Sequence, residues 1–317
     1  MKPNILHLFK TSYPSISGYT VRSHSILTKQ KLFCSPIALV DPYFIKKTRP
    51  DIIEGNIYYR YPPDLKLRLY NKDFLSQIPI LERFSQILYL NLLKTPMSLL
   101  RSIVKHRKID LIHGHTYARF SNFGEKVARE AKIPFIYEVR GFWEDSRVGV
   151  DRLKEFGYQY MKIRRSETNL MKKADALITL GKNMKKEIVS RGFDEKKVIV
   201  IPNGVDTEKF KPIAPDLNLK ERLKLKNKKI IAYIGSIQKI EGIEVLIHAI
   251  AQVKKKFKEI VLLLIGSSFK DYKKELIDLS KKLGTESSVH FIGRIQRDFI
   301  RNYYSIVDII VIPRKNT

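Results

Sequence analysis

Four short apolar runs in the second half of the chain each end in residues suited to holding a phosphate group. These residues are Gly235-Ser236, Gly266, Gly293-Arg294 and Arg314. Glycine lets backbone N–H groups approach a phosphate closely, and the N-terminus of a following helix adds positive potential. Each junction alone is weak evidence, because tight strand-to-helix turns also use glycine for their geometry. Ligands of open α/β sheets bind at the carboxyl ends of the strands, so the four junctions together predict a nucleotide site.

A further glycine turn lies in the first half of the chain. The sequence SISGYTVRSH follows the first apolar run and places Ser17-Gly18 just before a helix expected near Tyr19. This arrangement also predicts a close approach to phosphate.

Two histidines stand two residues apart at the end of another apolar run. On a strand, His113 and His115 of the sequence HGHTYAR face the same side. They could bind a metal ion, but no third ligand recurs at metal spacing. We therefore expect a polar site without a metal, in which His115 hydrogen-bonds a sugar or a phosphate.

The densest group of charges is the sequence YEVRGFWEDSR, which contains the only tryptophan. Structural salt bridges are the ordinary role for such a group. The alternative is a role in a cleft, and the position just past the end of an expected strand favours it. The group comprises Glu138, Arg140, Trp143, Glu144, Asp145 and Arg147.

Apolar runs alternate with amphipathic segments along the whole chain. Ten runs are expected strands, at residues 5–9, 36–40, 110–113, 135–139, 176–180, 198–201, 230–234, 261–265, 289–292 and 309–312. Several are continuous rather than alternating, as in parallel strands that are covered on both faces. The pattern predicts an α/β fold with two doubly wound parallel sheets.

The sequence PNGVD at residues 202–206 marks the expected boundary between two lobes, because an apolar run meets a Pro-Asn-Gly turn there. We predict a first lobe at 1–206, a linker at 207–228 and a second lobe at 229–317. The basic, apolar segment 65–108 predicts two helices broken near Pro96. Packing against the first sheet is the preferred interpretation of this segment, and a membrane-facing surface is the alternative.

Composition limits the class of protein. The 317 residues carry a formal net charge of +28, which indicates attraction to polyanions such as nucleic acid, anionic lipid or phosphorylated small molecules. The basic residues are dispersed, and no aromatic-plus-basic signature of an RNA-binding module is present, so we expect no nucleic-acid partner. Cys34 is the only cysteine and no apolar run reaches the length of a spanning helix, so we predict a cytoplasmic protein, with peripheral membrane contact as a further hypothesis.

The ordered set of motifs resembles the family 4 glycosyltransferases, whose GT-B fold has two Rossmann-like lobes. The motifs are SGYTVRSH, HGHTYAR, VIPNGVD, GSIQKIEG, VHFIGR and VDIIVIPR. The sequences YEVRGFWED and SGYTVR resemble in particular the subgroup associated with exosortase and exopolysaccharide loci. The resemblance implies transfer of a sugar from a nucleotide-sugar to a glycan or lipid-linked acceptor, with retention of configuration and no required metal, in cell-surface polysaccharide or glycoconjugate synthesis.

The resemblance also implies roles for particular residues. The acceptor side lies on the first lobe, where we predict His115, Glu138 and Arg140 as catalytic residues. The donor lies mainly on the second lobe, with the strand end at Gly293 beside the nucleobase. The predicted donor-binding residues are Ser17, Gly18, Gly235, Ser236, Lys239, Gly266, Gly293, Arg294, Ile295 and Arg314.

The chain departs from the family pattern at three places. Ser236 and Glu241 stand where many relatives carry the arginine and lysine that hold the pyrophosphate, so we expect Lys239 or Arg314 to supply that charge. Arg140 stands where a histidine is common.

The third departure is the paired glutamates that contact the donor sugar in the family, which do not occur in this sequence. We therefore expect an incomplete second lobe, from a fragment or a truncated gene product, and weak or no transferase activity of this chain alone. The alternatives are an inactive nucleotide-sugar-binding remnant, a phosphorylase or epimerase on the same lobes, and a nucleic-acid-binding protein.

Overall fold

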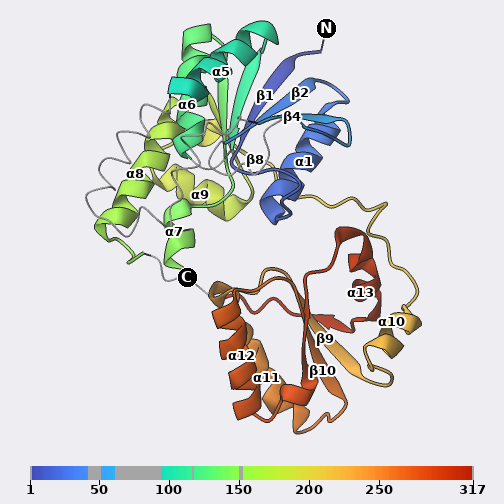
Figure 1. Ribbon diagram of the computed structural model, residues 1–317. Coiled ribbons are helices and arrows are strands. Elements are labelled where there is room, and N and C mark those ends of the chain that lie inside the picture. The colour runs from blue at the N-terminus through green and yellow to red at the C-terminus, as the bar shows by residue number, and fades with distance from the viewer. Residues whose placement is uncertain (1, 42–50, 61–93, 116–117, 150–152, 316–317) are drawn as a thin grey trace. The chain divides into compact units, whose positions relative to one another are not determined.

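The computed structural model describes residues 2–41, 51–60, 94–115, 118–149 and 153–315. The chain divides into two compact units (Figure 1). The first comprises Met1–Glu144 and Tyr158–Asn203, and the second comprises Asp145–Gly157 and Gly204–Thr317. The boundary after Asn203 falls within the PNGVD motif.

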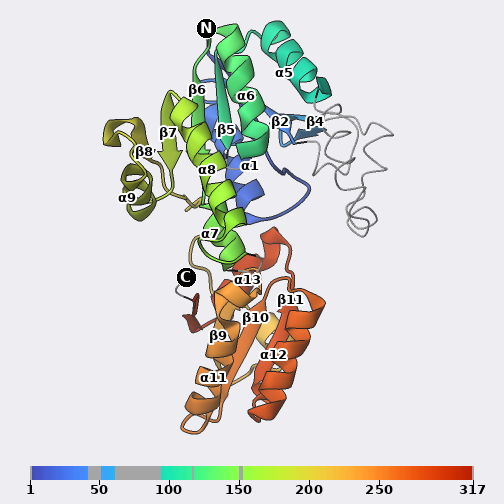
Figure 2. The same cartoon turned by 90° about the vertical axis from the view of Figure 1, so that its left-hand side faces the viewer.

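The first unit is built around an eight-stranded sheet in the order β3-β4-β2-β1-β5-β6-β7-β8. Its strands are β1 (Asn4–Phe9), β2 (Ser35–Val40), β3 (Asp51–Ile53), β4 (Asn56–Arg60), β5 (Leu111–His115), β6 (Phe135–Val139), β7 (Ala176–Thr179) and β8 (Val198–Val200). β3 pairs antiparallel with β4, and all other neighbours are parallel. The carboxyl ends of the parallel strands therefore lie along one edge of the sheet, as Figure 2 also shows.

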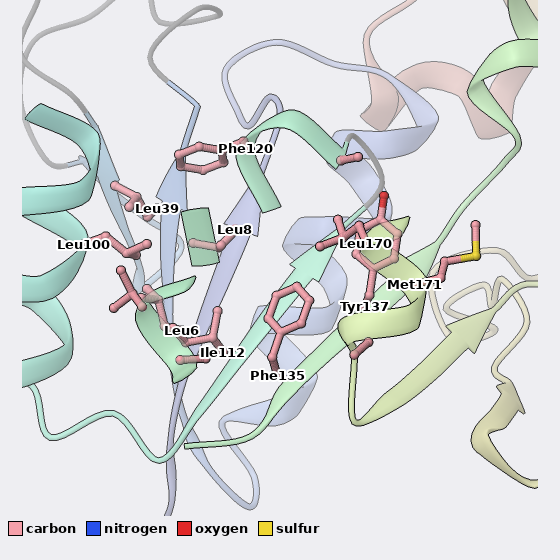
Figure 3. Close-up of a cluster of buried hydrophobic side chains, with 14 of the residues drawn as sticks. Leu6, Leu8, Leu39, Leu100, Ile112, Phe120, Phe135, Tyr137, Leu170 and Met171 are labelled. Atoms are coloured by element: carbon pink, nitrogen blue, oxygen red, sulfur yellow. The ribbon is translucent and has the colours of Figure 1, made fainter. Parts of the chain in front are cut away.

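Helices cover both faces of this sheet. They are α1 (Gly18–Gln30), α5 (Lys94–His106), α6 (Ala118–Ala131), α8 (Tyr158–Lys173) and α9 (Lys182–Ser190), with the 3-10 turn η2 (Glu195–Lys197), and α7 (Trp143–Val148) spans the boundary between the units. Side chains alternate along a strand, so Leu6 and Leu8 of β1 face one side and belong to the same buried cluster as Leu100 of α5 and Leu170 of α8 (Figure 3). Phe9 faces the opposite side, where α1 packs.

The second unit is built around a four-stranded sheet in the order β11-β10-β9-β12, with every pair parallel. Its strands are β9 (Lys229–Ile234), β10 (Ile260–Ile265), β11 (Val289–Gly293) and β12 (Ile309–Ile310). Its helices are α10 (Leu217–Arg222), α11 (Ile243–Lys254), α12 (Lys270–Lys282) and α13 (Ile300–Ile306), with 3-10 turns η3 (Lys239–Glu241), η4 (Glu286–Ser288) and η5 (Arg297–Phe299). Apolar clusters on the two faces of the sheet form its core, one with α11 and α12 and one with α10 and α13.

The predicted α/β fold with two parallel sheets is confirmed, and each of the ten expected strands is present with shifts of one or two residues at its ends. The sequence missed β3 and β4, because the polar pair Glu54-Gly55 interrupts this short hairpin. The expected linker at 207–228 contains α10, and Leu219 and Leu225 within it are buried in the core of the second unit. This segment is therefore part of the unit rather than a free connector.

The second of the two helices predicted around Pro96 is α5, which begins at Lys94 and includes Pro96 in its first turn. Proline is tolerated there, since the first N–H groups of a helix have no partner within it. The remainder of that prediction, residues 65–93, lies outside the described residues. None of the helices in the described ranges is both long enough and apolar enough to cross a lipid bilayer.

Candidate functional site

A buried polar layer lies between the first sheet and α1, where β1, β5 and β6 run side by side. Parallel pairing places His7 beside His113 and His115 beside Glu138. The alternation that sends Leu6 and Leu8 to the other face of β1 directs these polar side chains toward α1. Each of the four polar residues is at most 6% exposed.

Glu138 is the centre of this layer. Its Oε1 accepts a hydrogen bond from Nε of Arg22 at 2.7 Å and another from Nε of Arg140 at 3.2 Å. Its Oε2 lies 2.9 Å from Nδ1 of His115 and 3.5 Å from Nε2 of His113. One buried carboxylate therefore holds two guanidinium groups, of which Arg22 is 12% exposed and Arg140 only 6%.

Arg140 is held on several sides. It donates to the backbone oxygen of Tyr19 at 3.1 Å and to Oγ of Ser23 at 2.7 Å, both on α1. One of its terminal nitrogens lies 2.8 Å from Nδ1 of His115. The first residue after β6 is therefore fixed against the helix that covers it.

Arg22 connects this layer to the PNGVD motif. It donates to the backbone oxygens of Ile201 and Pro202, each at 3.1 Å, and to Oδ1 of Asn203 at 3.2 Å. The motif that marks the boundary between the units is thus anchored by α1 through the same arginine that holds Glu138.

Burial controls the protonation of these groups. It lowers the pKa of His115 and of His7 well below the ordinary value, and it lowers the pKa of His113 to about 4. Burial acts to raise the pKa of Glu138, but His115 and Arg140 beside it hold that pKa below its usual range. At neutral pH the layer therefore contains neutral imidazoles, one carboxylate and two guanidinium groups.

His7 extends the layer to α1. Its Nδ1 lies 3.0 Å from Nε2 of His115, and its Nε2 lies 2.7 Å from Oε1 of Gln30. A neutral imidazole has one donor and one acceptor nitrogen, so the group that Gln30 presents to His7 sets the tautomer of both rings. Sequence spacing missed His7, because it precedes His115 by 108 residues and only the pairing of β1 with β5 brings them together.

His7, His113 and His115 are the one group in the described residues with the ligand geometry of a metal site, with nitrogen atoms within 4.8 Å of one another. His7 is the third ligand that the sequence did not supply. The guanidinium of Arg140 at 2.8 Å from His115 places positive charge beside this group and disfavours a cation. The arrangement is better suited to a hydrogen-bonded support for the two arginines.

Ser17 and Gly18 form the exposed end of this region. Ser17 caps α1, since its Oγ accepts from the N–H of Thr20 at 3.2 Å and Oγ1 of Thr20 accepts from the N–H of Ser17 at 2.8 Å. A Cβ built on Gly18 would have no heavy atom within 4 Å. The turn therefore leaves open space at a helix N-terminus, as expected for a close approach of a ligand.

In the second unit, three predicted glycines lie in a row at the carboxyl ends of the strands. The N–H of Gly235 donates to Ile265 at 2.9 Å, and the N–H of Gly266 donates to Gly293 at 2.8 Å. A Cβ on Gly266 would lie 1.7 Å from the backbone oxygen of Gly235, so only glycine fits there. The N–H of Ser236, next in the loop, has no acceptor within the described chain and remains able to bind an anion.

The cations predicted to hold the donor phosphates are close to carboxylates. Nζ of Lys239 lies 3.4 Å from Oε2 of Glu275, and both side chains are about half exposed. A terminal nitrogen of Arg314 lies 3.6 Å from Oε1 of Glu241, whose side chain is 18% exposed. The N–H of Lys315 donates to the backbone oxygen of Ile240 at 3.0 Å, which brings Arg314 to the turn between β9 and α11.

The remaining two predicted residues follow β11. Arg294 is exposed, and Ile295 is partly buried against the cluster that includes Leu219. The structure thus gathers the predicted donor-binding residues of the second unit at one edge of its sheet and the predicted catalytic residues at one edge of the first.

Two family models match the chain in succession. Glycosyltransferase Family 4 matches residues 57–209, and Glycosyl transferases group 1 matches residues 215–316. The chain belongs to the family 4 glycosyltransferases. The end of the first match and the start of the second lie on either side of the segment that follows the PNGVD motif, close to the division between the two units.

Curated relatives of this glycosyltransferase include several named transferases. It is 26% identical over 226 residues to an uncharacterized glycosyltransferase of Methanocaldococcus jannaschii, a match that covers 65% of this chain and 52% of that protein. It is 26% identical over 147 residues to the lipopolysaccharide 1,2-N-acetylglucosaminetransferase of Salmonella typhimurium, covering 44% of this chain and 38% of that one. The matches to the first three such relatives span 31%, 52% and 38% of their lengths.

Solved structures confirm the GT-B fold. HepE of Anabaena in complex with UDP superposes with a TM-score of 0.69 at 18% identity, covering 99% of this chain and 74% of that one. Sucrose-phosphate synthase of Thermosynechococcus elongatus superposes with a TM-score of 0.72 at 15% identity, covering 99% of this chain and 76% of that one.

Proposed function

We propose that this glycosyltransferase transfers a sugar from a nucleoside diphosphate sugar to a glycan or lipid-linked acceptor, with retention of configuration and without a metal ion. The observation that carries the proposal is the row of Gly235, Gly266 and Gly293 at the carboxyl edge of the second sheet. The absence of side chains there lets a diphosphate approach the backbone, and the N–H of Ser236 is available to it. The solved neighbours that bind UDP and UDP-glucose agree with this choice of ligand.

The chemistry requires positive groups where the departing diphosphate gains charge. Arg314 is the candidate on the second unit, because it lies beside the glycine loop and can bind an anion with two parallel N–H groups. Glu241 occupies one side of this guanidinium, so a bound diphosphate would compete with a carboxylate that is already present. We infer that Glu241 orients Arg314 and limits its affinity for anions.

In the first unit, we assign Glu138 and His115 as positioning residues rather than groups that touch substrate, because both side chains are no more than 1% exposed. Their role is to hold Arg140 and Arg22 at fixed positions near the N-terminus of α1. This assignment differs from the sequence-based prediction, in which Glu138, His115 and Arg140 are all catalytic residues. The exposed turn at Gly18 is where a ligand would meet this region.

The acceptor class rests on the relatives. They include a lipopolysaccharide N-acetylglucosaminetransferase and the alpha-monoglucosyldiacylglycerol synthase of Streptococcus pneumoniae, which is 28% identical over 218 residues, 66% of this chain and 47% of that one. The name of the first relative indicates a glycan acceptor, and the name of the second indicates a lipid product. Glycans and lipids both occur in cell-surface glycoconjugates. We therefore propose one of these two acceptor classes.

The test is a transfer assay with the purified protein. Labelled UDP-, GDP- and ADP-sugars are offered with lipid-linked and free glycan acceptors, and the anomeric configuration of the product is assigned by NMR. The proposal expects release of a nucleoside diphosphate, activity that persists in EDTA, and a product with the anomeric configuration of the donor. A product of inverted configuration contradicts the retaining mechanism, and the absence of transfer with every donor contradicts the proposed activity.

A further inference from the structure

The first unit has a basic groove at the amino edge of its sheet, opposite the edge that carries His115 and Glu138. Four strands begin around it, since Asn4 starts β1, Ser35 starts β2, Gly55 precedes β4 and Lys108 precedes β5. The groove has a volume of about 530 Å³, within the range of small-molecule sites. It is therefore separate from the site described above.

Four cationic side chains line this groove: Lys2, Lys31, Arg107 and Lys108. No aspartate or glutamate lines it. Burial raises the pKa of the Cys34 thiol, which also lines the groove, so the thiol stays neutral and adds no negative charge.

The charges of the groove are not neutralised by the described part of the chain. Elsewhere in this unit Arg60 pairs with Asp51 at 2.9 Å and Arg101 pairs with Glu130 at 2.7 Å. Among the described residues, by contrast, no carboxylate forms an ion pair with any of the four cations of the groove. Two acidic residues lie near the lining residues in sequence: Asp110 accepts a hydrogen bond from the backbone N–H of Asn4 at 2.7 Å, and Oε2 of Glu54 lies 2.8 Å from Nε2 of His24.

Two of the cations are also held in place. Nε of Arg107 donates to the hydroxyl of Tyr59 at 2.9 Å, and the guanidinium lies 5.7 Å from the centre of that ring. Nζ of Lys2 donates to the backbone oxygen of Lys31 at 2.8 Å. Nζ of Lys31 lies so close to Gly55 that a Cβ there would be 3.1 Å away. Crowded like charges raise the free energy of the folded state, and a bound anion would relieve this cost.

We propose that this groove binds a phosphoryl group, as a second anion site at the edge of the sheet remote from the candidate transferase site. A guanidinium that is oriented by a neighbour, with three ammonium groups around a concave space, is suited to the several oxygens of a phosphate. Such a group can come from a soluble phosphorylated molecule or from the headgroup of an anionic phospholipid. The proposal does not depend on the transferase activity.

The experiment measures how readily each lysine of the groove reacts with an acetylating reagent. The protein is acetylated with a limiting reagent in the presence and absence of inorganic pyrophosphate, and the rate at each lysine is measured by mass spectrometry. The expected result is at least a fivefold slower acetylation of Lys2, Lys31 and Lys108 at saturating pyrophosphate. The exposed Lys162 and Lys172 of α8 serve as controls and should keep their rates.

The variant Arg107→Gln tests the assignment further. Loss of one charge-assisted interaction should weaken the protection by pyrophosphate roughly tenfold. The matched variant Lys162→Gln removes the same charge from the same unit and should leave protection unchanged. Protection at Lys239, in the other unit, reports any binding of pyrophosphate near the glycine loop and should be unaffected by Arg107→Gln.

A second arm identifies the source of the phosphoryl group. Vesicles of phosphatidylcholine containing phosphatidic acid replace pyrophosphate, and pure phosphatidylcholine vesicles serve as the control. Protection by pyrophosphate supports the proposal with a soluble ligand, and protection by phosphatidic acid vesicles alone supports it with a lipid headgroup. Unchanged acetylation in both arms, or equal effects of Arg107→Gln and Lys162→Gln, overturns it.

Discussion

The substitution Glu138→Gln tests whether one buried carboxylate organises the polar layer of the first unit. Glutamine preserves the volume of the side chain, so the change removes charge and not packing. It leaves Arg22 and Arg140, whose side chains are 12% and 6% exposed, without the anion between them. Removing one partner of a buried ion pair costs about 3–5 kcal/mol, because the remaining charge is left uncompensated. For a unit of this size that loss lowers the melting temperature by roughly 6–20 °C.

Trp143 provides the assay. It is the only tryptophan of the chain and belongs to the first unit, where Nζ of Lys10 lies 3.8 Å from the centre of its ring. Its fluorescence during urea unfolding therefore reports this unit. The matched control Glu130→Gln removes a carboxylate that is 47% exposed and pairs with Arg101, and such exposed pairs contribute about 0.2–1 kcal/mol. Equal free energies of unfolding for the two variants would refute the central role of Glu138.

Three further outcomes follow from the same geometry. Because burial lowers the pKa of His113 to about 4, the unfolded chain takes up a proton below pH 6.5 that the folded chain does not. The free energy of unfolding should therefore fall by about 1.5 kcal/mol between pH 6.5 and pH 5 because of this group. His113→Asn should reduce the slope of the unfolding free energy against pH over that range. In Gly266→Ala the new Cβ would lie 1.7 Å from a backbone oxygen, so this variant should lose the cooperative thermal transition of the second unit that circular dichroism measures. Gly18 has open space around it, so Gly18→Ala should leave the stability unchanged and weaken only nucleotide binding. Glu241→Gln should raise the affinity for a nucleoside diphosphate about two- to fivefold by calorimetry, because it removes the carboxylate beside Arg314, and a lower affinity would show that Glu241 mainly holds the arginine in place.

Much of the fold could be predicted from the sequence, because parallel strands covered on both faces are continuous apolar runs. The run predicted at 261–265 corresponds to β10 (Ile260–Ile265), which is buried throughout. The hairpin of β3 and β4 lacks such a run, and its burial depends on the neighbouring β2. The frequent charges after the PNGVD motif predict a linker, whereas Leu219 and Leu225 bury part of this segment in the core of the second unit.

Some residues of the candidate site could be predicted from the sequence, but the contacts between them could not. Glu138 and Arg140 lie two residues apart, so the sequence shows that their opposite charges are close together. Arg22 and His7 reach the same layer from α1 and β1, through contacts that no local pattern encodes. The signal that could have identified Arg22 is its position one helical turn after Gly18, on the helix that follows the first strand.

The central claim is that a nucleoside diphosphate binds at the glycine edge of the second sheet. The most direct measurement is the change in backbone amide chemical shifts when UDP, GDP or ADP is added to the isotope-labelled protein. At least one nucleotide should shift the amides of Gly235, Ser236, Gly266 and Gly293, and the shifts should diminish in Arg314→Gln. Saturable binding of a nucleotide that leaves all four amides unchanged, or no binding of any of the three, would contradict the account.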